Sequence, residues 1–137
     1  MRKALGLAAP LLLAGCVNQS ASYYIDGNEH ALSLRAQQDT FWSKQVTLRL
    51  MVSRLPDCQR QLVLGKAPLS DVEVELFASG EQVYTLRTTE QVWQVDTQGC
   101  TQIDPPQGEL GQQLGMFRLD GKKNLVFEQA AANAAAK

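Results

Sequence analysis

Apolar and polar residues alternate with a period of two along most of the chain after residue 30, which predicts strands rather than helices. The alternation is clear in residues 30–37 and 45–54, where every second residue is aliphatic or Ala. A short strand is expected at 61–64. Gly65 and Pro68 then predict a break in the chain.

A three-strand meander is expected next, with strands at 71–78 and 82–88 and a third strand around Trp93. If the first connecting loop has three residues, Leu76 faces Tyr84 and the apolar faces match. A two-residue loop would bring Glu75 opposite Tyr84 instead. We therefore predict the first register, because a slip by one residue turns every side chain to the other face.

The last regular unit is a hairpin of 114–119 and 123–127 around Asp120-Gly121, a dipeptide typical of hairpin turns. Two-residue and three-residue loops both give plausible pairs there, so its register stays open. With no amphipathic helix in between, six to seven strands predict an all-β domain over 30–128, built as a small antiparallel β-sandwich or barrel. The Ala-rich tail at 129–137 is expected to fray.

The amino terminus has a different character from the rest of the chain. Arg2 and Lys3 precede an apolar stretch at 4–14, which has the charge and length of a secretory signal peptide. The stretch closes on Leu13-Ala14-Gly15-Cys16, which resembles the lipobox of bacterial lipoproteins. A plain secretory signal and a buried apolar helix are the competing interpretations.

The resemblance implies that residues 1–15 are removed and that Cys16 is acylated on its sulfur and its new amino group. Several acyl chains, palmitate among them, would anchor the protein to a membrane without a spanning helix. Val17 and Asn18 follow Cys16. In such lipoproteins the absence of Asp at this place favours the outer membrane, on its periplasmic side. Residues 16–29 are then expected to be the lipidated cysteine and a tether.

Cys58 and Cys100 remain after Cys16 is assigned to the lipid. An exported protein folds in an oxidising compartment, where two remaining thiols usually pair, so we expect one disulfide between them. A redox pair or a metal site is the alternative. It lacks the close CxxC spacing, and the chain offers a single histidine as a further ligand.

Catalysis is not indicated, and we expect neither a metal nor a cofactor. His30 is the only histidine, and no GxSxG or phosphate-binding glycine motif is present in the sequence. Glu73 and Glu75 share a strand face, but exposed acids that alternate with core residues are typical of a solvated surface. The 13 Lys and Arg residues against 14 Asp and Glu residues give no basic field for nucleic acid.

Two groups of residues are candidates for contact with a partner. Arg54 and Arg60 flank the loop before Cys58, and a disulfide would hold that loop beside Pro105 and Pro106. Rigid loops on a β scaffold commonly carry recognition sites, so this rim is the predicted partner site. The second group consists of aromatic residues close to the predicted tether, at 23–24 and 41–42.

The predicted function is therefore a non-enzymatic binding or assembly role in the envelope, with the membrane and an envelope protein as partners. The alternative is an inhibitor of a cell-wall hydrolase. Small β-barrel lysozyme inhibitors are also envelope lipoproteins that carry a disulfide, but their Ser/Gly-rich inhibitory loop motif is not recognisable in this sequence.

Overall fold

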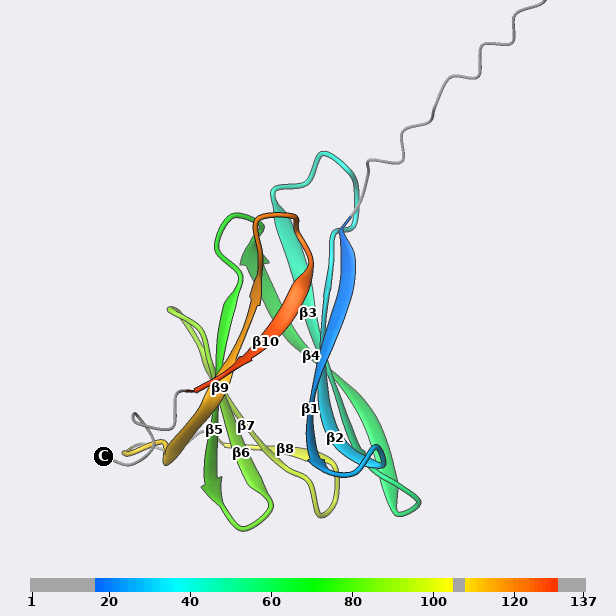
Figure 1. The fold of residues 1–137 in the computed structure, drawn as a ribbon, viewed down its shortest axis with the longest axis vertical. Coiled ribbons are helices and arrows are strands. Elements are labelled where there is room, and N and C mark those ends of the chain that lie inside the picture. The colour runs from blue at the N-terminus through cyan, green and yellow to red at the C-terminus, as the bar shows by residue number, and fades with distance from the viewer. Residues whose placement is uncertain (1–16, 105–107, 131–137) are drawn as a thin grey trace, which may run out of the picture.

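The computed structural model describes residues 17–104 and 108–130, which form two antiparallel β-sheets packed face to face (Figure 1). The first sheet is a meander of strands in chain order, β1 (Asn18–Asp26), β2 (His30–Gln37), β3 (Gln45–Arg54) and β4 (Cys58–Pro68). In the described part of the chain no helix is long and apolar enough to cross a membrane.

The second sheet has the order β10-β9-β5-β6-β7-β8. Its strands are β5 (Glu73–Gly80), β6 (Val83–Arg87), β7 (Val92–Asp96), β8 (Thr101–Ile103), β9 (Gln112–Leu119) and β10 (Leu125–Gln129). The connection after β8 carries the chain from one edge of the sheet to the other side of β5, where β9 pairs.

The core lies between the two sheets because one face of each strand is aliphatic or aromatic. The largest apolar side chains that are almost completely buried come from both sheets: Leu32, Leu34, Val46, Leu48, Leu50, Val52, Val74, Leu76, Leu86, Val95 and Phe117. The edges β1 and β10 also approach each other, since the rings of Tyr23 and Phe127 lie 5.3 Å apart between centroids.

The disulfide between Cys58 and Cys100 joins the two sheets at one end of the sandwich, with a Cα–Cα distance of 6.0 Å. Cys58 begins β4, and Cys100 lies between β7 and β8. The predicted all-β class, the sandwich alternative and the disulfide are therefore confirmed. Residues 17–104 and 108–130 contain ten strands, however, and not six to seven.

The prediction of a tether over 16–29 is wrong for most of that segment. Residues 18–26 are β1, which pairs with β2 from Asn18 opposite Gln37 to Asp26 opposite His30. Ala21, Tyr23 and Ile25 pack against the core, while Ser20 and Ser22 alternate with them. Because two of the polar residues are small serines, the alternation looked like a linker. Residues 1–15, which are predicted to be removed, and Cys16 lie outside the described residues.

Strand β4 is also longer than predicted. The chain does not break at Gly65, because a bulge there, with φ of 140°, lets the strand continue to Pro68. In the meander, Leu76 pairs with Leu86 and Ala78 with Tyr84, so the predicted register of β5 against β6 is wrong by two residues. An even shift keeps the same side chains in the core. The pairing of Leu86 with Trp93 is confirmed.

The final hairpin closes through residues 120–124, with Leu119 opposite Leu125. The backbone N–H groups of Asn124 and Lys122 donate to the Asp120 carboxylate and lower the pKa of that carboxyl. Of the predicted tail at 129–137, Gln129 belongs to β10 and the Ala130 N–H donates to the Leu114 carbonyl. The remaining tail lies outside the described residues.

Candidate binding site

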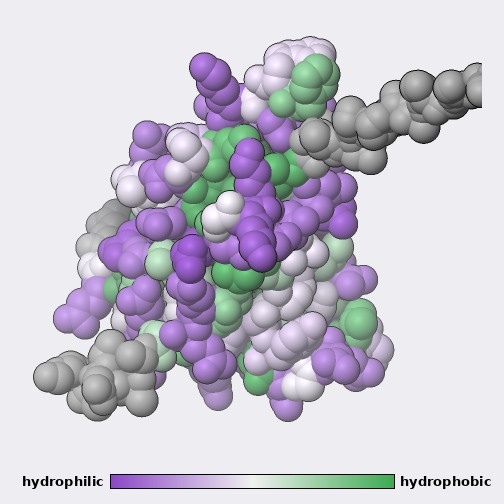
Figure 2. All heavy atoms as spheres, turned by 45° about the horizontal axis from the view of Figure 1, so that its top comes forward, coloured by the Kyte–Doolittle hydropathy of each residue, from purple (hydrophilic) through white to green (hydrophobic). Residues whose placement is uncertain are grey.

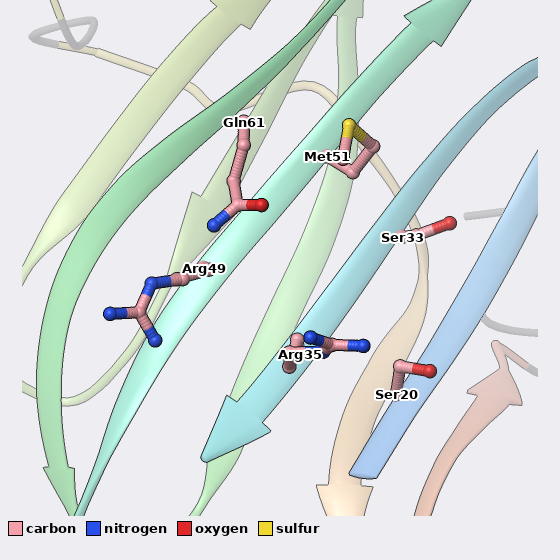
Figure 3. A pocket seen from close by; sticks show the side chains of 6 residues that line it. All are labelled: Ser20, Ser33, Arg35, Arg49, Met51 and Gln61. Carbon is pink, nitrogen blue, oxygen red and sulfur yellow. The ribbon is translucent and has the colours of Figure 1, made fainter. Parts of the chain in front are cut away.

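A hollow of about 230 Å³ lies on the outer face of the β1–β4 sheet, the face turned away from the core. Figure 3 shows its lining, in which Arg35 of β2 and Arg49 of β3 are the charged groups. The other lining residues are Ser20, Ser33, Met51 and Gln61. The hollow therefore combines two cations with hydroxyl, amide and thioether groups.

The two arginines are directly opposite each other in the antiparallel ladder. Their side chains extend in different directions, Arg35 toward β1 and Ser20, and Arg49 away from them (Figure 3). Arg49 donates from Nη1 to the Gln37 Oε1 atom at 3.0 Å. Like charges at directly opposed strand positions destabilise a sheet, so this pair lowers the free energy of unfolding of the free protein.

Neither guanidinium forms an ion pair with any residue of 17–104 or 108–130. The ion pairs of this part of the chain join Arg54 to Asp57, Arg87 to Glu75, and Arg118 to Glu128. Strands β1 to β4 contain a single acidic residue, Asp26 at the end of β1 beside His30. No carboxylate from β2, β3 or β4 therefore neutralises Arg35 and Arg49 on this face.

The charge of the chain is divided unequally between its two sheets. Residues 17–68, which hold the first sheet, contain six Lys and Arg residues and four Asp and Glu residues, a net charge of +2. Residues 69–137 contain five basic and ten acidic residues, a net charge of −5. This asymmetry would orient a negatively charged partner toward the first sheet.

A guanidinium presents N–H donors in a planar fork that matches a carboxylate or a phosphate, which makes an unpaired arginine pair suited to binding anions. The lining includes hydroxyl and amide groups that can add hydrogen bonds. These groups suit the hollow to the recognition of an anion.

The rim predicted as the partner site lies at the disulfide end of the sandwich. Arg54 is partly buried there, 3.8 Å from Asp57, and Arg60 is exposed on β4. Pro105 and Pro106, the other two residues of the predicted rim, lie outside the described residues. Arg60 is not in the hollow that Arg35 and Arg49 line.

His30 also lies at the disulfide end, opposite Arg54 in the ladder. Its Nε2 atom is 3.2 Å from the Thr97 hydroxyl, which links the two sheets. Partial burial and the Arg54 guanidinium lower the pKa of His30 below its usual value of 6.5, against an opposite effect from Asp26. These contacts give His30 a structural place between the sheets.

Glu75, one of the two glutamates on the same face of β5, is held by neighbouring side chains. Glu75 accepts hydrogen bonds from Arg87 Nε at 2.7 Å and from Gln113 at 3.3 Å. The Arg87 guanidinium also lies over the Phe77 ring, 5.0 Å from its centroid. Glu75 thus belongs to a structural ion pair. In the described ranges, no three His, Cys, Asp or Glu side chains are arranged to hold a metal ion.

The arginine hollow was missed in the sequence, although its residues were visible as the polar side of two predicted strands. Arg35 and Arg49 are separated by a loop whose length alone does not fix their alignment. The signal that could have been used is the absence of acidic residues from both strands.

Comparison of the chain with protein-family models, curated proteins and solved structures finds no match. The interpretation of the site therefore rests on its own geometry.

Proposed function

We propose that this protein is a lipid-anchored envelope lipoprotein with a non-enzymatic binding role, and that it binds an acidic protein surface through the outer face of β1–β4. The observation that carries the proposal is the opposed pair Arg35 and Arg49, which has no carboxylate partner among the described residues. A partner that supplies carboxylates would relieve the repulsion between these two cations.

The anchor is the lipobox cysteine. Cys16 directly precedes Val17, which is buried and ordered against the first sheet. A domain that begins one residue after its lipid would be held close to the bilayer, on the periplasmic side of the outer membrane in our proposal. The hollow would then face sideways, because it lies on the broad face of the sheet.

The partner surface would meet a mixed lining. The Arg35 and Arg49 forks would bind carboxylates, and Met51 in the lining of the hollow and Val63 on β4 would supply apolar contact. Val63 is 61% exposed, which is unusual for an aliphatic side chain in the middle of a strand. Charge would then favour an acidic partner and speed encounter, while apolar contact would contribute affinity.

In-cell photocrosslinking of the full chain tests the proposal. A photoreactive residue at Gln61 should capture a partner, and the crosslink should disappear when Arg35 and Arg49 are both replaced by Glu. Two controls are used. A photoreactive residue at Thr89, in the β6–β7 connection of the other sheet, is the control for the crosslinking position. The double variant Lys122→Glu, Lys123→Glu is the control for the change of charge. Crosslinks from Gln61 that persist in the arginine double variant would contradict the proposed surface.

The anchor has a separate test. Intact-mass measurement of the mature protein should show loss of residues 1–15 and the mass of acyl groups on Cys16. A chain that retains residues 1–15 with an unmodified Cys16 would overturn the proposed anchoring, whatever the crosslinking shows.

A further inference from the structure

Two large aromatic side chains project from the β2–β3 connection. Phe41 is 67% exposed and Trp42 is 69% exposed. Their rings pack against each other edge to face, with centroids 4.7 Å apart and an interplanar angle of 83°. The pair therefore forms an apolar projection that packs on itself and leaves most of its surface to its surroundings.

This projection is tied to Val17, the first residue that the structure describes. The Val17 N–H donates to Gln38 Oε1 at 3.0 Å, and the Gln38 N–H donates to the Val17 carbonyl at 2.8 Å. The Gln38 side-chain amide also donates to the carbonyls of Phe41 and Ser43. Gln38 thus holds the aromatic loop and the amino-terminal end of β1 together.

Cys16 directly precedes Val17 in the sequence, and consecutive Cα atoms are about 3.8 Å apart across a trans peptide bond. The short distance leaves no room for a flexible spacer between the proposed lipid and the end of the domain that carries Phe41 and Trp42. Any bilayer that holds acyl chains of Cys16 would therefore meet this end of the sandwich.

The same end carries the β9–β10 turn, as Figure 1 shows. The Leu125 N–H donates to Gln19 Oε1 at 3.4 Å, which places the turn beside the start of β1. Lys44, Lys122 and Lys123 are exposed in these two connections, and Asp39 and Asp120 offset two of their charges. In Figure 2, which turns this end toward the viewer, a group of white and green atoms projects at the top of the molecule.

We infer that Phe41 and Trp42 insert into the headgroup region of the bilayer that holds the acyl chains of Cys16. Tryptophan favours this region because its ring is largely apolar and its indole N–H can still meet a polar partner. The inference rests on the proposed lipidation and adds a second contact with the same membrane. Two contacts with the bilayer, one through the acyl chains on Cys16 and one through Phe41 and Trp42, would fix the orientation of the domain.

The domain would then stand upright on the bilayer, with the long axis of its strands pointing away from the membrane. Strand β1 has nine residues and starts at the membrane end, so it would carry the chain about 30 Å away from the bilayer. The disulfide and His30 would lie at the far end, and the arginine hollow would stand on the side of the domain. An upright domain keeps that hollow accessible to a partner in the periplasm.

Tryptophan fluorescence tests the inference, because the chain has two tryptophans with opposite exposure. Trp42 is 69% exposed and Trp93 is 8% exposed. The mature acylated protein is reconstituted into vesicles of phosphatidylethanolamine and phosphatidylglycerol, with or without acyl chains brominated near the headgroup. Bromine quenches tryptophan on contact, so we expect a loss of Trp42 emission and a shift of that emission to shorter wavelength.

The matched control is Trp42→Phe, which keeps an aromatic ring and leaves Trp93 as the reporter. Its emission should be unchanged by brominated lipid. Vesicle-bound, acylated wild-type protein whose emission is equally unchanged would overturn the inference and leave the proposed anchoring intact. That result would assign Phe41 and Trp42 to contact with another protein. Protein that is not acylated and does not float with vesicles would overturn both.

Discussion

Val17 and Gln38 form a reciprocal pair of hydrogen bonds across the open end of β1 and β2. The Val17 N–H donates to the Gln38 side chain at 3.0 Å, and the Gln38 N–H donates to the Val17 carbonyl at 2.8 Å. Both residues are buried, with 8% and 5% of their surfaces exposed. A glutamine is therefore used as a clamp at the place where the chain enters the domain.

The first prediction concerns this clamp. Gln38→Leu leaves the Val17 N–H buried without its acceptor, and we expect a loss of about 1–3 kcal/mol in the free energy of unfolding. Urea unfolding followed by circular dichroism measures the change. Gln45→Leu, an exposed position on β3, is the control and should change stability little. An equal effect at both positions would contradict the role of Gln38.

The arginine pair gives a second prediction. Arg35→Gln removes one of two directly opposed cations, so the free energy of unfolding should rise by about 0.2–1 kcal/mol at low ionic strength. Salt screens the repulsion, and the gain should shrink as salt is added. Arg60→Gln, an exposed arginine opposite Val52, is the control and should give no such gain. A variant less stable than wild type at low salt would be evidence against repulsion.

The third prediction concerns the disulfide. Cys58 and Cys100 are 42 residues apart, and opening a loop of that length should lower the free energy of unfolding by roughly 4 kcal/mol in the chain-entropy treatment. Replacing both residues by Ser and measuring denaturant unfolding checks it. Wild-type protein under reducing conditions should show a similar loss. A difference under 1 kcal/mol would mean that tertiary packing already restrains the two loops.

Gly115 gives a fourth prediction. A Cβ at this position of β9 would clash with the Glu128 carbonyl oxygen and the Phe127 ring of β10. Gly115→Ala should therefore cost about 1–3 kcal/mol, since the neighbouring strand must move. Thermal unfolding checks the prediction. Gly108→Ala, where no atom lies within 4 Å of the added group, is the control and should be close to neutral.

His30 gives a prediction about pH. Its pKa is lowered in the folded protein, first by partial burial and then by Arg54, so the unfolded chain binds a proton more readily. The contribution of neutral His30 to the free energy of unfolding should be fully present above the unfolded pKa of 6.5. It should decrease as the pH falls through 6.5 toward the folded pKa. His30→Gln should flatten this part of the stability profile, measured by urea unfolding between pH 7.5 and about 5. A slope that survives the substitution would assign the effect to other groups.

Much of the fold could be predicted from local pattern. The strands at 30–37 and 45–54 were predicted with the bounds that the structure shows, because regular alternation of aliphatic and polar residues is a direct local signal. The strand of Ser20 and Ser22 was missed, since small polar residues resemble a linker when no partner strand is in view. Whether such a segment pairs depends on the neighbour it meets.

For the functional residues, too, some relationships could be predicted from the sequence and others could not. Pairing of Cys58 with Cys100 could be inferred from cysteine count and the expected compartment, because two thiols leave one choice. The opposition of Arg35 and Arg49 could not be inferred, because the register of β2 against β3 depends on how the 38–44 connection closes and on the packing of the two sheets. The predicted rim of Arg54 and Arg60 followed from sequence proximity to Cys58, which says nothing of the surface each side chain joins.

By itself, the sequence determined the all-β class, the placement of the aliphatic core face and the disulfide, because each depends on local alternation or on residue identity. Only the tertiary structure decided that residues 18–26 pair as a strand and that Arg35 and Arg49 stand opposed without an ion pair to any described residue. It also decided that the loop of Phe41 and Trp42 is bonded, through Gln38, to Val17. The residues in each of these contacts are far apart along the chain, and their sequence separation does not predict the distance between them. They come together only when the strands pair and the two sheets pack.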